Sequence, residues 1–188
     1  MAFVDSLAVM LLITGFSAII LALFVYFSVR GKKDMSMLVV PGFIFGLFDL
    51  VSGFIMSFTW PLPGAYNMLF GDPILALGLL LVAGSYMIYK KMDVRVLSIF
   101  AFFLGIYIAM SAAGMANFNL ESGSHFLAAF GFYVAASLSA LFSPVVYLNA
   151  KGSGKYAYYL LFVLLVITAF AALFLGYTSI YQHLQAPP

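Results

Sequence analysis

A single acidic residue, Asp49, lies near the middle of a long apolar segment, within the run GLFDLVSG at residues 46–53. A charged side chain at the centre of a bilayer costs at least ~2.5–3.5 kcal/mol, so we expect Asp49 to face protein or water and not lipid. Gly42, Gly46, Asp49 and Gly53 follow one another at intervals of four, three and four residues. That spacing places them on one face of a helix.

Two interpretations of this face remain open. In the first, the small residues Gly42, Gly46 and Gly53 line a pathway or pocket, and Asp49 is a proton-linked or solute-binding group. In the second, the glycines form a helix-packing face, because small residues let the backbones of membrane helices approach closely. Asp49 is then a protonated carboxyl group, hydrogen-bonded to a neighbouring helix, since no lysine or arginine is available within the membrane to neutralise it.

A second candidate face carries hydroxyl groups. Gly131, Ala135, Ser139 and Ser143 are each four residues apart, so they also share one face of a helix. The hydroxyls of Ser139 and Ser143 line a polar path in one interpretation, and the face is a close-packing surface in the other. Pro144 follows at once and is expected to kink this helix.

Three titratable residues, Asp72, Glu121 and His125, fall between apolar segments and form a separate candidate group. They are expected on the outer face of the membrane, where a pH-sensing role is chemically reasonable. Their spacing is not typical of a metal site, and no metal is expected. For Asp72 the stronger prediction is structural: it caps a helix, and Pro73 occupies the first helical position.

The elements that carry these residues are six apolar segments, which we place at residues 7–29, 37–60, 73–89, 95–116, 126–148 and 156–181. The chain is 65% hydrophobic and only 7% charged, whereas soluble domains carry roughly 25% charged residues. A helix of about 20 apolar residues spans a bilayer. The sequence therefore predicts an all-α, polytopic membrane protein: one domain over 1–188, with six transmembrane helices in three hairpins.

All eight lysine and arginine residues lie in the first, third and fifth connections, at residues 30–34, 90–95 and 149–155. Cytoplasmic loops of membrane proteins carry such an excess of basic residues. We therefore expect a multi-pass protein of the cell membrane, with the three basic loops in the cytoplasm and the N-terminus and C-terminus outside.

Several classes of function are not expected. The chain has no cysteine, and it lacks the phosphate-loop, dinucleotide and hydrolase motifs that would indicate an enzyme. No catalytic residue and no cofactor is predicted. The basic residues form no run long enough to predict nucleic-acid binding.

The run FGDPILALGLL at residues 70–80, and the basic turn from Lys151 to Lys155 before the last apolar segment, resemble the amide/urea channel family in sequence and in topology. That resemblance implies six helices with both ends outside. The tryptophan and tyrosine that narrow the pore of that family have no match at Leu81, Ser85, Ala136 or Ser139, so no pore residue is carried over. The chain also resembles prokaryotic six-helix families without an assigned function.

These observations predict a channel or facilitator for a small, mostly uncharged solute, embedded in the lipid bilayer as a homo-oligomer. The alternative is a structural or accessory subunit of a larger membrane complex, such as a respiratory assembly, with partner membrane subunits. The scarcity of polar residues inside the apolar segments favours the alternative. A third possibility is the solute-binding component of a transporter.

Overall fold

The structure is a computed structural model and describes residues 6–120, 123–148 and 154–185. The described part of the chain contains α1 (Ser6–Val29), α2 (Val39–Thr59), α3 (Asp72–Tyr89), α4 (Leu97–Asn117), α5 (Gly123–Leu141) and α6 (Gly154–Gln185). Each of these helices belongs to a segment long and apolar enough to cross a membrane. The prediction of an all-α fold with six such segments is confirmed.

Short helical turns extend several of these helices. Turns of 3₁₀-helix precede α2 (Ser36–Leu38) and α4 (Val94–Val96), and one follows α5 (Ser143–Tyr147). A π-helical turn, Asn67–Gly71, runs directly into α3, so the third helical segment begins six residues earlier than the predicted 73–89. Hydropathy falls in that turn, which is why the apolar pattern missed it.

The fifth helical segment differs from the prediction of one kinked helix over 126–148. The α-helix ends at Leu141, and the chain continues as 3₁₀-helix. Pro144 has no N–H to donate to the carbonyl of Ala140, and its ring clashes with a continuing α-helix. The hydroxyl of Ser143 donates to that carbonyl instead, at 2.6 Å.

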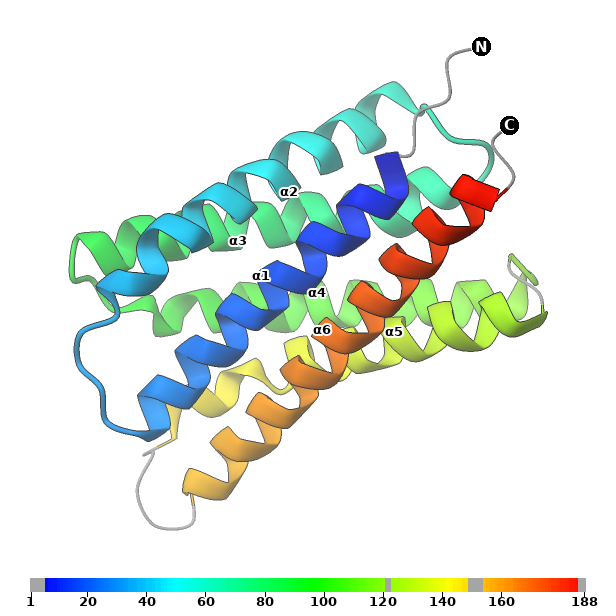
Figure 1. Cartoon of the computed structure of the whole chain (residues 1–188). Coiled ribbons are helices and arrows are strands. Elements are labelled where there is room, and N and C mark those ends of the chain that lie inside the picture. The colour runs from blue at the N-terminus through cyan, green and yellow to red at the C-terminus, as the bar shows by residue number, and fades with distance from the viewer. Residues whose placement is uncertain (1–5, 121–122, 149–153, 186–188) are drawn as a thin grey trace.

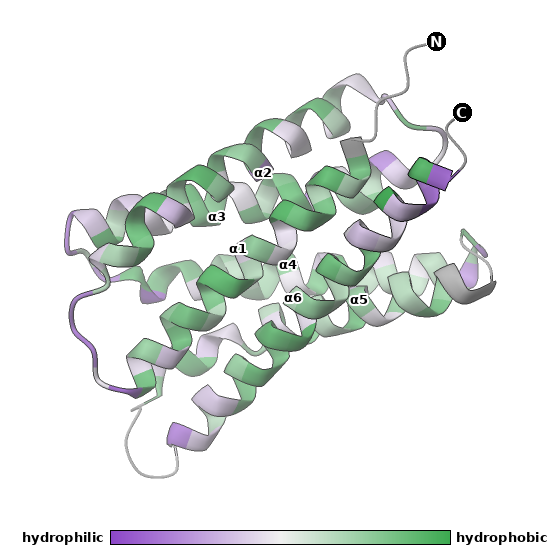
Figure 2. Cartoon of the chain, viewed as in Figure 1, coloured by the Kyte–Doolittle hydropathy of each residue, from purple (hydrophilic) through white to green (hydrophobic). Residues whose placement is uncertain are grey.

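The helices run antiparallel to their chain neighbours, and each contacts the next, with α6 closing the ring on α1 (Figure 1). We call the end where α1 begins and α6 ends the terminal end. The opposite end carries Arg30, Lys90 and the start of α6, and we call it the basic end. Polar residues gather at both ends, and apolar residues fill the length between them (Figure 2).

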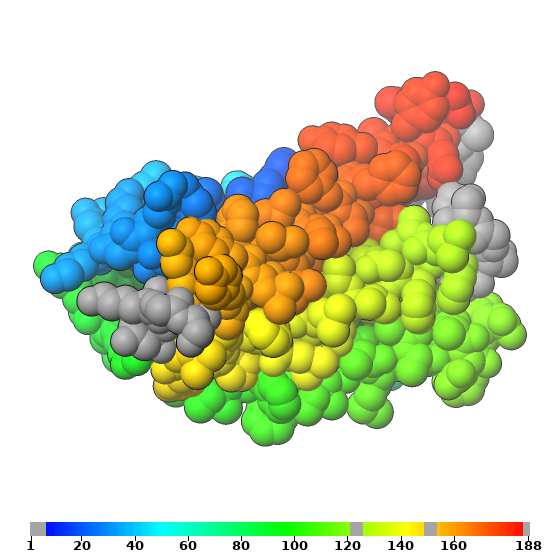
Figure 3. All heavy atoms as spheres, turned by 90° about the horizontal axis from the view of Figure 1, so that it is seen from below, coloured from blue at the N-terminus to red at the C-terminus, as the bar shows by residue number. Residues whose placement is uncertain are grey.

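The most extensive contacts join α1 with α6, α2 with α3, and α4 with α5. The helices linked by the basic connections pack less extensively against each other than these three pairs do. Seen from below, α6 lies between α1 and α5 (Figure 3). The fold is therefore held by three tight helix pairs that differ from the predicted hairpins. The hairpins join α1 with α2, α3 with α4 and α5 with α6, whereas the tight pairs are α1 with α6, α2 with α3 and α4 with α5.

Glycine permits the close approach of helices within these pairs. A Cβ added at Gly53 would lie 2.4 Å from the backbone nitrogen of Leu75, and one at Gly78 would lie 2.2 Å from that of Leu50. In lipid, where apolar side chains gain little from leaving the solvent, such close packing is a main source of helix association. Further glycines fill the same role in the α4–α5 and α1–α6 pairs: Gly105, Gly15 and Gly176.

Candidate functional site

A cavity of about 250 Å³ lies inside the ring of helices. Its wall comes from α1, α3, α4, α5 and α6, from the turns at the basic end, and from the π-helical turn before α3. α2 contributes none of the lining within its own α-helical bounds, since it packs behind, against α1 and α3. The cavity is therefore a property of the whole bundle and not of one hairpin.

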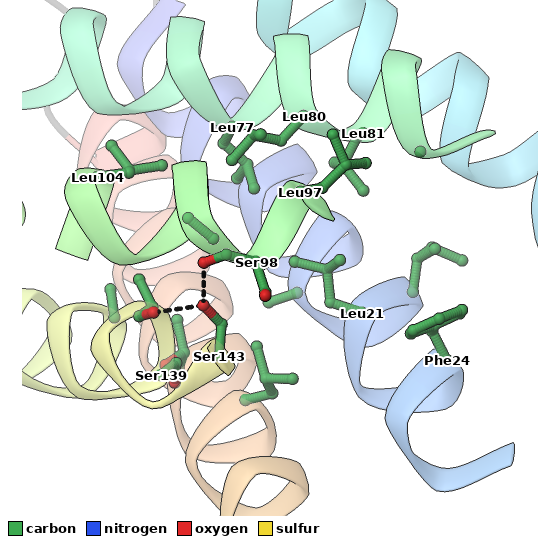
Figure 4. Close-up of a pocket in the computed structure, with 18 of the residues that line it drawn as sticks. Leu21, Phe24, Leu77, Leu80, Leu81, Leu97, Ser98, Leu104, Ser139 and Ser143 are labelled. Atoms are coloured by element: carbon green, nitrogen blue, oxygen red, sulfur yellow. Dashed lines mark hydrogen bonds between the residues drawn. The ribbon is translucent and has the colours of Figure 1, made fainter. Parts of the chain in front are cut away.

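The wall is mostly hydrocarbon. Leu21 and Phe24 of α1, and leucines of α3 and α4, surround the part of the cavity drawn in Figure 4. The lining also includes serine and threonine residues at a few places: Thr14, Ser85, Ser98, Ser139, Ser143 and Thr168. Among the described lining residues, Arg95 is the only charged one, and its side chain is 53% exposed at the basic end. The deeper wall presents neutral groups only.

The two ends of the cavity differ. Arg95 is exposed, so the lining reaches the surface at the basic end. Toward the terminal end the last lining residues, Leu69, Phe70, Phe132 and Tyr133, are all buried. They belong to a core cluster that also includes Met10, Met56 and Met115. The cavity thus ends in a packed core in the terminal half of the bundle.

The π-helical turn Asn67–Gly71 forms part of this closed end. The hydroxyl of Tyr133, a side chain only 1% exposed, donates to the carbonyl of Leu69 at 2.5 Å. The buried side chain of Asn67 accepts from the backbone N–H of Leu62 at 3.0 Å and donates to the carbonyl of the same residue. Single π-helical turns often occur at functional sites of proteins.

Asp72 follows this turn, and the prediction that it caps a helix is wrong. Its side chain makes no capping bond, because the π-helical turn already supplies helical backbone before α3. The carboxylate instead accepts hydrogen bonds from Ser57 of α2 at 2.6 Å and from Tyr107 of α4 at 2.7 Å. Asp72 therefore joins three helices in the terminal half of the bundle.

Asp49 is fully buried between α1 and α2. The hydroxyl of Ser17, also fully buried, donates to its Oδ2 atom at 2.6 Å, and within the described residues its Oδ1 atom has no hydrogen-bond partner. Asp49 is not among the residues that line the cavity. The geometry around it is that of a polar contact between two helices.

The glycines that share its helix face also contact other helices. A Cβ at Gly42 would lie 2.7 Å from the hydroxyl oxygen of Ser85, and one at Gly46 would lie 2.7 Å from the Cβ of Leu81. Gly53 abuts the backbone of α3 as described above. This arrangement is that of a helix-packing face, one of the two interpretations that the spacing left open.

The hydroxyl groups of α5, in contrast, do lie at the cavity. Ser139 pairs with Thr168 of α6 at 3.0 Å. Ser143 donates to the carbonyl of Ser98 of α4 at 2.9 Å (Figure 4). They line the cavity and also tie α5 to its neighbours. Of the other candidates, Glu121 lies outside the described residues. His125 belongs to α5, and the structure describes its backbone but not its side chain.

Sequence reasoning missed the hydroxyls of Thr14, Ser85, Ser98 and Thr168. A signal existed in the first segment, where Thr14 and Ser17 stand three residues apart and share one face of an otherwise apolar helix. The described residues hold no group of three or more histidine, aspartate or glutamate side chains that could bind a metal ion. The chemistry of the site is thus neutral hydrogen bonding inside an apolar wall.

Comparisons with known proteins give a family but no characterised relative. No curated protein and no solved structure matches the chain, and the family match carries no link to the amide/urea channels. The family model described as "Protein of unknown function (DUF981)" matches residues 1–186. Because this match covers almost the entire chain, the protein belongs to the DUF981 family.

Proposed function

We propose that this protein is a membrane channel or facilitator that takes a small, mostly uncharged solute into its central cavity. The observation that carries the proposal is the cavity itself, which reaches the basic end and has a neutral deeper wall. Its volume of about 250 Å³ exceeds the ~150 Å³ of an apolar cavity that holds benzene. There is room for a solute of several non-hydrogen atoms.

The neutral wall supports the choice of an uncharged solute. An ion that enters a mostly hydrocarbon cavity loses its hydration and finds no opposite charge among the described residues of the deeper wall. Selectivity of this kind follows from pore diameter, lining polarity and electrostatic barriers. A neutral molecule avoids the cost of removing a charged group from water.

The orientation proposed from the charge pattern places the basic end in the cytoplasm of a cell that carries the protein in its plasma membrane. The cavity then opens inward, and its closed end faces outward. Passage of a solute requires that closed end to open, so Leu69, Phe70, Phe132 and Tyr133 have to separate. On this proposal, the cavity is that of a facilitator open to the cytoplasm.

The test is solute flux into liposomes, with urea, acetamide and glycerol as neutral probes and light scattering as the readout. Ala136→Phe places a large ring in the cavity wall, while Val134→Phe places the same ring on the exposed face of the same helix. We expect flux of at least one probe, a loss of at least about tenfold in Ala136→Phe, and no change in Val134→Phe. Equal flux through Ala136→Phe and wild type would show that the cavity is not the route.

A second candidate function is favoured by the closed end of the cavity. Among the described residues, no lining residue continues the cavity to the terminal end, as expected for a subunit of a larger membrane complex that transports nothing itself. Native mass spectrometry of the mildly extracted protein separates the two. Masses that are multiples of the 20.5 kDa chain support a homo-oligomeric facilitator, and masses that require other polypeptides support the subunit.

A further inference from the structure

The cavity is long and narrow. Along α3 its lining runs from Pro73 to Ile88, which corresponds to about 22 Å at 1.5 Å per residue. Along α1 the lining runs from Thr14 to Val25, or about 16 Å. A volume of about 250 Å³ spread over such a length leaves a space of small cross-section. That shape suits an extended chain better than a compact molecule.

The apolar side chains of the wall are incompletely packed. Six of them line the cavity and are only half-buried, although they belong to helices of a closed ring (Figure 4): Leu21, Phe24, Leu77, Leu80, Leu97 and Leu104. Apolar cavities in proteins stay dry and bind apolar ligands, and one of ~150 Å³ holds the six carbon atoms of benzene. By the same ratio, about 250 Å³ holds about ten carbon atoms.

The hydroxyl groups of the wall offer little to a ligand. Four of them donate to backbone carbonyls at 2.6 to 2.9 Å: Ser98, Ser139, Ser143 and Thr168. The hydroxyl oxygen of Thr14 is buried, and Ser85 is only 4% exposed. A polar group inside this wall would lose its hydrogen bonds to water without replacement. The part of a ligand that enters the cavity therefore has to be hydrocarbon.

The basic end determines which polar group such a ligand carries. Among the described residues of that end, seven lysine and arginine side chains stand against two aspartates, Asp34 and Asp93. Arg95, where the lining reaches the surface, donates to Asp93 from Nε and Nη2, which leaves the N–H groups of Nη1 for a further acceptor. Clusters of lysine and arginine at a membrane surface attract anionic head groups. An anionic group at this end also remains in contact with water.

We propose that the cavity binds a fatty acid, with its hydrocarbon chain inside the ring of helices and its carboxylate at the basic end beside Arg95. A volume of about ten carbon atoms takes one chain. The second acyl chain of a phospholipid would lie among the polar residues of that end. This inference goes beyond the proposed function, because the fatty acid binds whether or not a small solute crosses the membrane.

The experiment is photolabelling of the full chain, purified in detergent, with dodecanoate that carries a diazirine near the end of its chain. Labelled residues are identified by mass spectrometry of peptides. We expect label at the closed end of the cavity, on Leu69, Phe70 or Ile108. An excess of plain dodecanoate should remove this inner label. It should leave the label on outward-facing residues such as Phe103 and Met110, which the detergent surrounds.

Two comparisons test the position of the chain and of the carboxylate. Ala101→Phe places a ring in the cavity wall and should abolish the inner label, whereas Ile99→Phe, on the exposed face of the same helix, should retain it. Dodecanoate should displace the inner label at about fivefold lower concentration than dodecanol, the factor that one nearby basic side chain supplies. The displacement uses wild type only, so it remains decisive if Ala101→Phe does not fold.

Four results would overturn the inference. Wild type without an inner label, or with one that dodecanoate does not displace, would show that no fatty acid chain occupies the cavity. An inner label that persists in Ala101→Phe would mean that the probe does not follow this wall. Equal displacement by dodecanol would remove the role of the carboxylate. Displacement by dilauroyl phosphatidylglycerol as effective as that by dodecanoate would make the occupant a membrane lipid. None of these results decides the proposed function, which rests on the flux of small solutes through wild type and Ala136→Phe.

Discussion

Among the described glycines, Gly78 of α3 leaves the least room for an added Cβ, and this makes a quantitative prediction. In Gly78→Ala the new Cβ would lie 2.2 Å from the backbone nitrogen of Leu50 and 2.6 Å from its Cα. Non-bonded carbon atoms pack at about 3.5–4.0 Å, so a shortfall of about 1 Å has to be relieved. Both contacted atoms are backbone, and no rotamer change removes them. α2 and α3 therefore have to move apart.

The size of the effect follows from two opposing terms. Overpacking of a well-packed interface costs about 1–3 kcal/mol. Alanine in place of glycine within a helix gains roughly 0.5–1 kcal/mol. Separation of α2 and α3 also loosens the neighbouring contacts at Gly46 and Gly53, so we place the overpacking cost at the upper end of its range. The net loss of stability is then about 2 kcal/mol.

The assay is thermal unfolding of the purified protein in one detergent, followed by circular dichroism. A loss of about 2 kcal/mol lowers the midpoint by roughly 4–8 °C in a domain of this size. Gly131→Ala is the matched control, because a Cβ at Gly131 meets nothing within 4 Å, and only the helix-propensity gain remains. Its midpoint should equal or exceed that of wild type. If Gly78→Ala unfolds with or above wild type, the two helices do not approach as described.

Three further predictions concern hydrogen bonds and charge. Ser17→Ala leaves the buried Asp49 without its donor and should lower the unfolding midpoint, with a loss of about 0.6–2 kcal/mol; an unchanged midpoint would mean that the bond is absent. Tyr133→Phe removes the hydrogen bond to the π-helical turn and should cost about 1 kcal/mol and speed amide hydrogen exchange at residues 67–71; unaltered exchange there would contradict that role. Hydrogen bonds from Arg95, from its guanidinium and then from its backbone N–H, lower the pKa of Asp93 to about 2. A lowered pKa in the folded state means that the pair stabilises the protein above about pH 4 and loses that effect as pH falls toward 2. The difference in midpoint between wild type and Asp93→Asn should therefore stay constant from about pH 5 to 8 and shrink in acid, whereas a difference that varies between pH 5 and 8 would exclude the pair as its source.

The sequence predicted well those features that depend on local composition. A helix in lipid satisfies its own backbone hydrogen bonds, so every long apolar run has to be a helix, and the segments can be located from hydropathy alone. The expectation that Asp49 faces protein follows from the cost of exposing an acid to lipid, and Asp49 is indeed buried. Its partner Ser17 was not predicted, because a donor on a distant segment leaves no local pattern.

Local sequence patterns did not predict the features that depend on contacts between helices. The pairing of α1 with α6 joins segments at opposite ends of the chain, and glycine faces show that a helix packs closely but not against which partner. The π-helical turn at Asn67–Gly71 includes the polar Asn67, so the hydropathy pattern predicted a loop between two helices there. The cavity is a space that side chains from five helices leave unfilled, so the residues of its wall can be identified only in the assembled bundle.

The pairing of α1 with α6 has a consequence for how the bundle is made. Helices enter the membrane in chain order, so α1 waits for its most extensive partner until α6 has been synthesised. Until then, contacts with α2 such as the Ser17–Asp49 hydrogen bond hold α1 in place. The ring of helices and its cavity are complete only once the last helix docks at Gly15 and Gly176. A chain that stops before α6 therefore lacks the main partner of α1 and one wall of the cavity.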